Sequence, residues 1–108
     1  MIRALILDDE KHCIDNLHWQ LQQYCPEVEI IAVCDDAKNG LQQIQREQPQ
    51  LVFLDVEMPG MNGFEMLEAL KEINFDIIFT TAFDQYAIRA IKFGSLDYLV
   101  KPIDKNEL

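Results

Sequence analysis

Residues 51–63 read LVFLDVEMPGMNG, and this stretch decides the fold. Its first four residues are apolar without alternation, which is typical of a strand buried on both faces of a parallel sheet. Asp55 follows directly, and the pair Pro59 and Gly60 then predicts a turn. The stretch therefore places a carboxylate at the end of a buried strand.

Four further apolar runs flank this strand along the chain. The five expected strands are Ile2–Leu7, Val28–Cys34, Leu51–Leu54, Ile77–Thr81 and Leu96–Val100. Between them the apolar spacing changes to three and four residues, which is typical of amphipathic helices. The positions that carry this spacing are Ile14, Leu17, Leu21, Tyr24, Ala37, Leu41, Ile44, Phe64, Leu67, Leu70, Tyr86, Ile88 and Ile91. Strand and helix alternate, which predicts a three-layer α/β fold with right-handed crossovers.

Length and charge narrow the class of protein. At 108 residues the chain is expected to form one domain. Nineteen acidic and nine basic residues give a net charge of −10, so this segment should be repelled by DNA. No run reaches the roughly 18 apolar residues of a membrane helix, and the start of the chain lacks the layout of a signal peptide. We therefore expect a cytoplasmic domain that contacts neither nucleic acid nor membrane.

The cysteines and histidines carry no recognisable metal or disulfide pattern. Cys13, Cys25 and Cys34 show no CxxC or Cys/His ligand spacing, so we interpret them as reduced, partly buried small hydrophobes. His12 and His18 are expected on the solvent side of a helix. At the other end of the chain, Asp104 and Glu107 have the spacing of a helix cap. The chain stops one turn later, so we expect the natural protein to continue.

Polar residues follow the expected strands where these end. Asp8 and Asp9 follow the first strand, Asp55 the third, and Thr81 and Lys101 close the fourth and fifth. Such ends meet at one edge of a parallel sheet, where ligands bind. Crowded carboxylates repel one another unless a cation neutralises them, and oxygen ligands suit Mg²⁺. A carboxylate beside Mg²⁺ can attack a phosphoryl group, whose charge Lys101 and the Thr81 hydroxyl would stabilise.

Four ordered motifs resemble those of two-component response-regulator receiver domains. They are LDDE at 7–10, LDVEMPGMNG at 54–63, Thr81-Ala82, and YLVKP at 98–102. The resemblance covers nearly the whole chain. It implies a doubly wound, flavodoxin-like receiver fold over residues 1–108, with a five-stranded parallel sheet of order 2-1-3-4-5 and a truncated last helix. It also implies a phosphoacceptor switch rather than an enzyme, phosphorylated by a sensor histidine kinase.

The resemblance further implies a role for each residue at the strand ends. Asp55 would be the phosphoacceptor, and Lys101 would contact the phosphoryl oxygens. Thr81 and Tyr98 would form the switch pair, in which both side chains move toward the phosphorylated site. The Lys101–Pro102 bond is commonly cis in this family. The expected Mg²⁺ ligands are Asp8, Asp9, Asp55 and the main-chain carbonyl of Glu57.

A narrower resemblance concerns the second half of the chain. Residues 78–88 (IFTTAFDQYAI) and 97–102 (DYLVKP) are similar to receivers of the LytR/AlgR type. Those receivers carry a C-terminal LytTR DNA-binding domain, so the resemblance implies a transcription regulator whose effector domain is absent from this chain. The output surface, and a homodimer interface, would extend from Asp84 to the C-terminus.

Alternatives remain open at single residues and for the function. One of the first two aspartates could cap a helix, and Thr80 competes with Thr81 because adjacent strand residues face opposite sides. Glu57 and Phe83 are expected at the mouth of the site, where they would tune the phosphoryl lifetime: Glu57 adds negative charge and Phe83 could shield the site from water, and no lifetime is predicted from them. An aspartyl phosphohydrolase is disfavoured because residues 8–10 lack the DxD spacing and no segment could form a cap. An interaction module that works without phosphorylation would keep the fold and lose the chemistry.

Overall fold

The computed structural model describes residues 1–82, 90, 94–95, 97–101 and 103. Its elements are β1 (Ile2–Leu7), α1 (Lys11–Tyr24), β2 (Val28–Cys34), α2 (Ala37–Glu47), β3 (Leu51–Asp55), α3 (Gly63–Glu68), β4 (Asp76–Thr81) and β5 (Asp97–Val100). The strands form one parallel sheet of order β2-β1-β3-β4-β5. The predicted α/β class and strand order are thus confirmed.

Several expectations concern residues outside this described part. They are the helical positions Tyr86, Ile88 and Ile91, Phe83 at the mouth of the site, Leu96, the Lys101–Pro102 bond, the cap of Asp104 and Glu107, and most of the face from Asp84 to the C-terminus.

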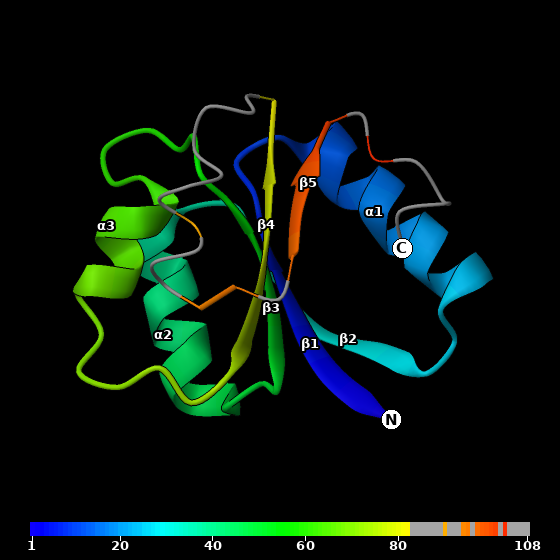
Figure 1. The fold of residues 1–108 in the computed structure, drawn as a ribbon, viewed down its shortest axis with the longest axis horizontal. Coiled ribbons are helices and arrows are strands. Elements are labelled where there is room, and N and C mark those ends of the chain that lie inside the picture. Colours follow the sequence, from blue (N-terminus) through cyan, green and yellow to red (C-terminus); the bar gives the residue numbers. More distant parts are fainter. Residues whose placement is uncertain (83–89, 91–93, 96, 102, 104–108) are drawn as a thin grey trace.

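Helices cover both faces of the sheet, α1 on one side and α2 with α3 on the other (Figure 1). Alternate residues of β1 face the two sides of the sheet. Leu5 and Leu7 pack in the core beneath α2 and α3, whereas Ala4 and Ile6 pack in the core beneath α1. All five residues of β3 are buried. This explains why its sequence is continuously apolar up to the aspartate that ends it.

The register of the sheet brings the carboxyl ends of its strands together. Leu7 pairs with Leu54, so the residues that follow β1 and β3 leave the sheet side by side. Asp55 pairs with Thr80, and Thr81 pairs with Val100, the residue before Lys101. The expected site residues therefore share one edge of the sheet.

Local signals at the helix ends position the loops at this edge. The Asp36 side chain caps α2 by accepting a 2.7 Å hydrogen bond from the Asn39 N–H. A capping box between Asn62 and Glu65 starts α3. The apolar spacing predicts a helix that reaches Leu70, but α3 already ends at Glu68.

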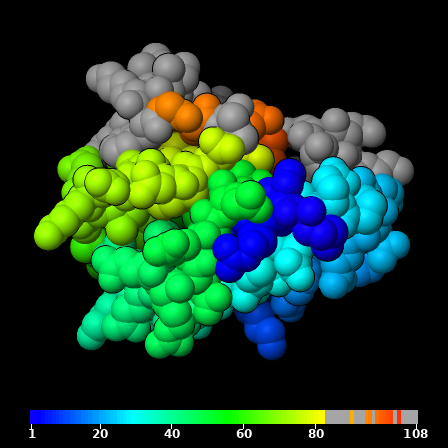
Figure 2. All heavy atoms as spheres, turned by 90° about the horizontal axis from the view of Figure 1, so that it is seen from below, coloured from blue at the N-terminus to red at the C-terminus, as the bar shows by residue number. Residues whose placement is uncertain are grey.

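The opposite end of the molecule carries the starts of the strands. Figure 2 shows this face, with the blue start of β1 between the green region around β3 and the cyan region of β2. A groove of about 1010 Å³ lies here between the end of α2 and residues 69–76, and none of the predicted site residues lines it. Among the described residues, no helix combines the length and the apolar character that crossing a membrane requires.

Candidate functional site

Two buried carboxyl groups and one partly buried ammonium meet at the carboxyl edge of the sheet. The side chains of Asp8, Asp55 and Lys101 are 5%, 2% and 12% exposed. Lys101 Nζ lies 2.8 Å from Asp8 Oδ2 and 3.6 Å from Asp55 Oδ2. The same ammonium is 3.8 Å from Oε1 of the more exposed Glu10. The structure therefore brings together residues from the ends of β1, β3 and β5, as the sequence predicts.

Main-chain groups hold these side chains in place. The Glu57 N–H donates to Asp55 Oδ1 over 3.2 Å, and the Glu10 N–H donates to Asp8 Oδ1 over 3.0 Å. The Lys101 N–H donates to the carbonyl of Thr81 over 2.7 Å. The Asp8 and Asp55 carboxylates are thus each held by the loop that follows their own strand, and the backbone of Lys101 is held by β4.

The electrostatics of the site favour a neutral Asp55 when no cation other than Lys101 is near. Burial raises the pKa of the Asp55 carboxyl from 3.8 to about 8, and the charge of Asp8 adds to the rise. The ammonium of Lys101 opposes it, whereas the Asp9 carboxyl, within hydrogen-bonding reach, raises it further. For Lys101, burial acts against the charge, but the hydrogen bond to Asp8 and the nearby carboxylates raise its pKa overall.

The donor set fits a hard divalent cation. Asp9 Oδ1 is buried and accepts no hydrogen bond from any group in the described part of the chain. Carboxylate oxygens of Asp8, Asp9 and Glu10 lie within 4.8 Å of one another. Among the described residues, the Lys101 ammonium alone faces this group and Asp55, so negative charge is in excess there. Mg²⁺ prefers such oxygen ligands and retains waters beside them.

The two threonines at the end of β4 are both buried but lie differently. Thr80 lines a hollow of about 360 Å³ together with Asp8 and Lys101, whereas Thr81 is completely buried. Tyr98 is half-buried, and its ring centroid lies 6.4 Å from that of Phe79. Because adjacent strand residues face opposite sides, only one of the threonines can face the charged group formed by Asp8, Asp55 and Lys101. The switch roles of Thr81 and Tyr98 stay predictions.

One residue that makes a buried contact near this site was not predicted from the sequence. Gln20, on the buried face of α1, donates from Nε2 to the carbonyl of Ile103 over 2.8 Å. This buried hydrogen bond ties α1 to the segment that follows Lys101. A glutamine among the apolar positions Leu17 and Leu21 was the available signal, because a buried amide needs a partner.

The predictions for the cysteines and for His12 agree with the structure, whereas those for His18 and Tyr24 do not. The three cysteines are free thiols, with Cys25 and Cys34 buried. His12 is exposed, as predicted, but His18 is half-buried. Tyr24, placed in the apolar pattern of α1, is 47% exposed and contacts Trp19 edge to face.

Comparison with known proteins identifies the family to which this chain belongs. The response regulator receiver domain family matches residues 4–108. An uncharacterized response regulatory protein of Shewanella oneidensis is 43% identical over 109 residues, which are 100% of this chain and 46% of that protein. The transcriptional regulatory protein BtsR of Escherichia coli is 41% identical over 109 residues, 100% of this chain and 45% of BtsR. The sensory transduction protein LytT of Bacillus anthracis is 37% identical over 110 residues, 100% of this chain and 44% of LytT.

Solved structures agree with the fold. A DNA-binding response regulator of the LuxR family from Staphylococcus aureus has a TM-score of 0.87 and 26% identity, covering 99% of this chain and 92% of that one. The response regulatory domain of MrkE from Klebsiella pneumoniae has a TM-score of 0.88 at 24% identity, covering 98% and 88%. The chain spans less than half the length of the curated relatives named above. The charged edge of the sheet and the match over residues 4–108 agree, and the chain belongs to the receiver domains of two-component response regulators.

Proposed function

We propose that this receiver domain accepts a phosphoryl group on Asp55 from the phosphohistidine of a sensor histidine kinase, in a reaction that requires Mg²⁺. The observation that carries the proposal is the buried Asp55 carboxylate, 3.6 Å from the Lys101 ammonium. The Asp9 carboxyl lies within hydrogen-bonding reach of Asp55, and its buried Oδ1 accepts no hydrogen bond in the described part of the chain. An ordinary structural aspartate at a strand end would need neither neighbour.

The ligands proposed for Mg²⁺ are Asp8, Asp9, Asp55 and the main-chain carbonyl of Glu57. When bound, the ion supplies charge that offsets the carboxylates and stabilises the phosphoryl oxygens. Asp55 then acts as the ionised nucleophile: an oxygen–phosphorus bond forms, the phosphorus–nitrogen bond breaks, and the imidazole leaves with the electron pair. Lys101 is close enough to Asp55 to contact the phosphoryl oxygens after transfer.

The consequence we propose is a switch rather than turnover of a separate substrate. The domain catalyses only its own phosphorylation and dephosphorylation, in the cytoplasm, and phosphorylation shifts a pre-existing equilibrium. Thr81 and Tyr98 respond to the phosphoryl group, and the face from Asp84 to the C-terminus carries the signal or pairs in a homodimer. The similarity to LytT supports a LytTR effector domain, which would bind DNA in place of this acidic segment.

Acetyl phosphate tests the chemistry without the kinase. With Mg²⁺ present, the intact mass of the wild-type protein should increase by one phosphoryl group, and Asp55→Asn should show no increase. Asp76→Asn is the matched control, because Asp76 is an exposed aspartate at the opposite end of β4. It should be phosphorylated like wild type. An unmodified wild type, or an Asp55→Asn variant modified to the same extent, would contradict the proposal.

A further inference from the structure

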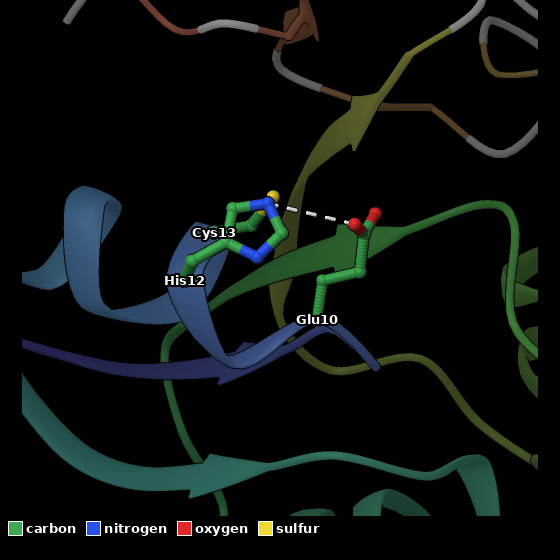
Figure 3. Close-up of side chains that lie close together, drawn as sticks. All are labelled: Glu10, His12 and Cys13. Carbon is green, nitrogen blue, oxygen red and sulfur yellow. Dashed lines mark ion pairs between the residues drawn. The ribbon is translucent and has the colours of Figure 1, made fainter.

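A second group of metal-binding side chains lies at the start of α1. Glu10, His12 and Cys13 each offer one ligand atom, and these atoms lie within 4.8 Å of one another. His12 Nε2 is 3.6 Å from Glu10 Oε2, and Figure 3 shows the His12 ring beside Cys13 with this nitrogen directed toward the carboxylate. Ligands of a tetrahedral zinc ion, with bonds of about 2.0–2.3 Å, are about 3.3–3.7 Å apart. Small side-chain rotations would therefore suffice.

The three side chains also converge on a space that can hold an ion. All of them line the hollow of about 360 Å³ beside the phosphoacceptor site. The side chains of Glu10 and His12 are 49% and 80% exposed, so an ion can reach them from solvent. Cys13 is less exposed and forms part of the wall. The hollow leaves room for a water molecule as a fourth ligand.

We propose that Glu10, His12 and Cys13 bind one zinc ion per chain, with water completing the coordination. Carboxylate, imidazole and thiolate together suit a borderline-soft ion such as Zn²⁺, whereas the oxygen-only group around Asp8 and Asp9 suits Mg²⁺. In the sequence, the spacing between the three cysteines does not match that of a zinc site. The structure supplies the missing ligands from the histidine and the glutamate just before Cys13.

The two carboxylate oxygens of Glu10 face different neighbours. Glu10 presents Oε2 to His12 and Oε1 to Lys101. An ion on Oε2 therefore leaves the 2.8 Å pair between Lys101 and Asp8 intact. Burial raises the pKa of the Cys13 thiol, and the charges of Asp8 and Glu10 add to this while Lys101 opposes it. Zinc must displace the thiol proton, so its binding releases a proton.

Cobalt is the probe for this site, since Co²⁺ replaces Zn²⁺ and reports a thiolate ligand by a charge-transfer band in the near ultraviolet. The full 108-residue chain is titrated with Co²⁺ in excess Mg²⁺, and Zn²⁺ is then added to displace the cobalt. Wild type should bind one cobalt ion with this band. Cys13→Ser should lose the band, and His12→Ala should weaken binding by at least the 10- to 100-fold that loss of an outer-shell partner costs.

Matched variants separate this site from other cysteines, histidines and carboxylates. Cys25→Ala and His18→Ala should keep both the band and the affinity, and so should Asp9→Asn in the oxygen-only group. No band in wild type, or a band that survives Cys13→Ser, would overturn the zinc site. Phosphorylation of Asp55 is measured separately by mass. A protein that is phosphorylated but shows no band would contradict only the zinc site. A protein that shows the band but is not phosphorylated would contradict only the phosphoacceptor role.

Discussion

Asp55 has an ionisable carboxyl group, yet only 2% of its side chain is exposed to water. In the described part of the chain it has one ammonium nearby, that of Lys101, which lies closer to Asp8 than to Asp55. Removing such a group from water costs several kcal/mol unless its charge is compensated. Without a divalent cation, the carboxyl responds by holding its proton, and the pKa of Asp55 is accordingly raised.

Asp55→Asn should therefore stabilise the metal-free protein increasingly as the pH rises. The unfolded state releases the Asp55 proton near pH 3.8 and the folded state near pH 8, so wild-type stability falls as the pH rises between these values. Asn has no proton to lose. The free energy of unfolding of Asp55→Asn relative to wild type should grow by more than about 1.4 kcal/mol, the equivalent of one pKa unit. Urea unfolding in EDTA between pH 4 and pH 8 measures it.

The exposed Asp76 supplies the control for this series. Asp76→Asn should differ from wild type by no more than about 0.5 kcal/mol at every pH, as surface substitutions usually do. A difference between Asp55→Asn and wild type that stays flat with pH would show that Asp55 is ionised throughout.

Lys101→Met should destabilise the metal-free protein, because two buried carboxylates lose their only ammonium among the described residues. Removing one partner of a buried ion pair costs about 3–5 kcal/mol. We expect about 3 kcal/mol at pH 8 and less at pH 5, where proton uptake by Asp55 relieves the repulsion. Unfolding in EDTA at both pH values measures the loss. Lys38→Met, at an exposed position of α2, should cost less than about 0.5 kcal/mol, and an equal loss in both variants would contradict the prediction.

At the scale of elements, the loop from β3 to α3 is built around a close backbone contact. A Cβ atom added at Gly63 would lie 2.6 Å from the main-chain oxygen of Asp55 and 3.3 Å from Cα of Val56. The Gly63 N–H also donates to the carbonyl of Val56 over 2.9 Å. The first turn of α3 thus packs directly on the backbone of Asp55, and a side chain at Gly63 would push the two apart.

Gly63→Ala should lower the rate of phosphorylation by acetyl phosphate and destabilise the fold by about 1–3 kcal/mol, the usual cost of overpacking. Gly60→Ala is the matched control in the same loop. Gly60 has φ +80, so alanine there is strained and costs stability. Its Cβ would meet nothing within 4 Å, so the phosphorylation rate of this variant should stay near that of wild type. Equal rate losses in both variants would mean that stability, rather than the contact with Asp55, sets the rate.

At the scale of the whole molecule, the sequence predicts those features that follow from the pairing of parallel strands. Apolar runs end where polar residues begin, and the register then places Asp55 beside Thr80 and Thr81 beside Val100. The contact between Gln20 and Ile103 joins residues 83 positions apart and has no periodic signal. The convergence of Glu10 and Cys13 on one hollow depends on side-chain directions at a helix start. Periodicity encodes faces and elements, and it does not encode such directions.

Mg²⁺ should raise the melting temperature of the whole domain, because the carboxylates proposed to bind it come together only in the folded state. At a concentration 100 times its Kd, the ion stabilises the fold by about 2.7 kcal/mol, which in a domain of this size corresponds to about 10 °C. Thermal unfolding followed by circular dichroism measures the shift, and Asp9→Asn should remove most of it.

The net charge of −10 requires a control for general screening. Any cation relieves repulsion across such a surface, so Na⁺ at equal ionic strength sets the baseline. Asp76→Asn removes the same charge as Asp9→Asn, but far from the carboxyl edge of the sheet, and it should keep the full shift with Mg²⁺. If both variants lost the shift equally, Mg²⁺ would be acting on the overall charge. A loss confined to Asp9→Asn would place the ion at the buried Asp9 oxygen.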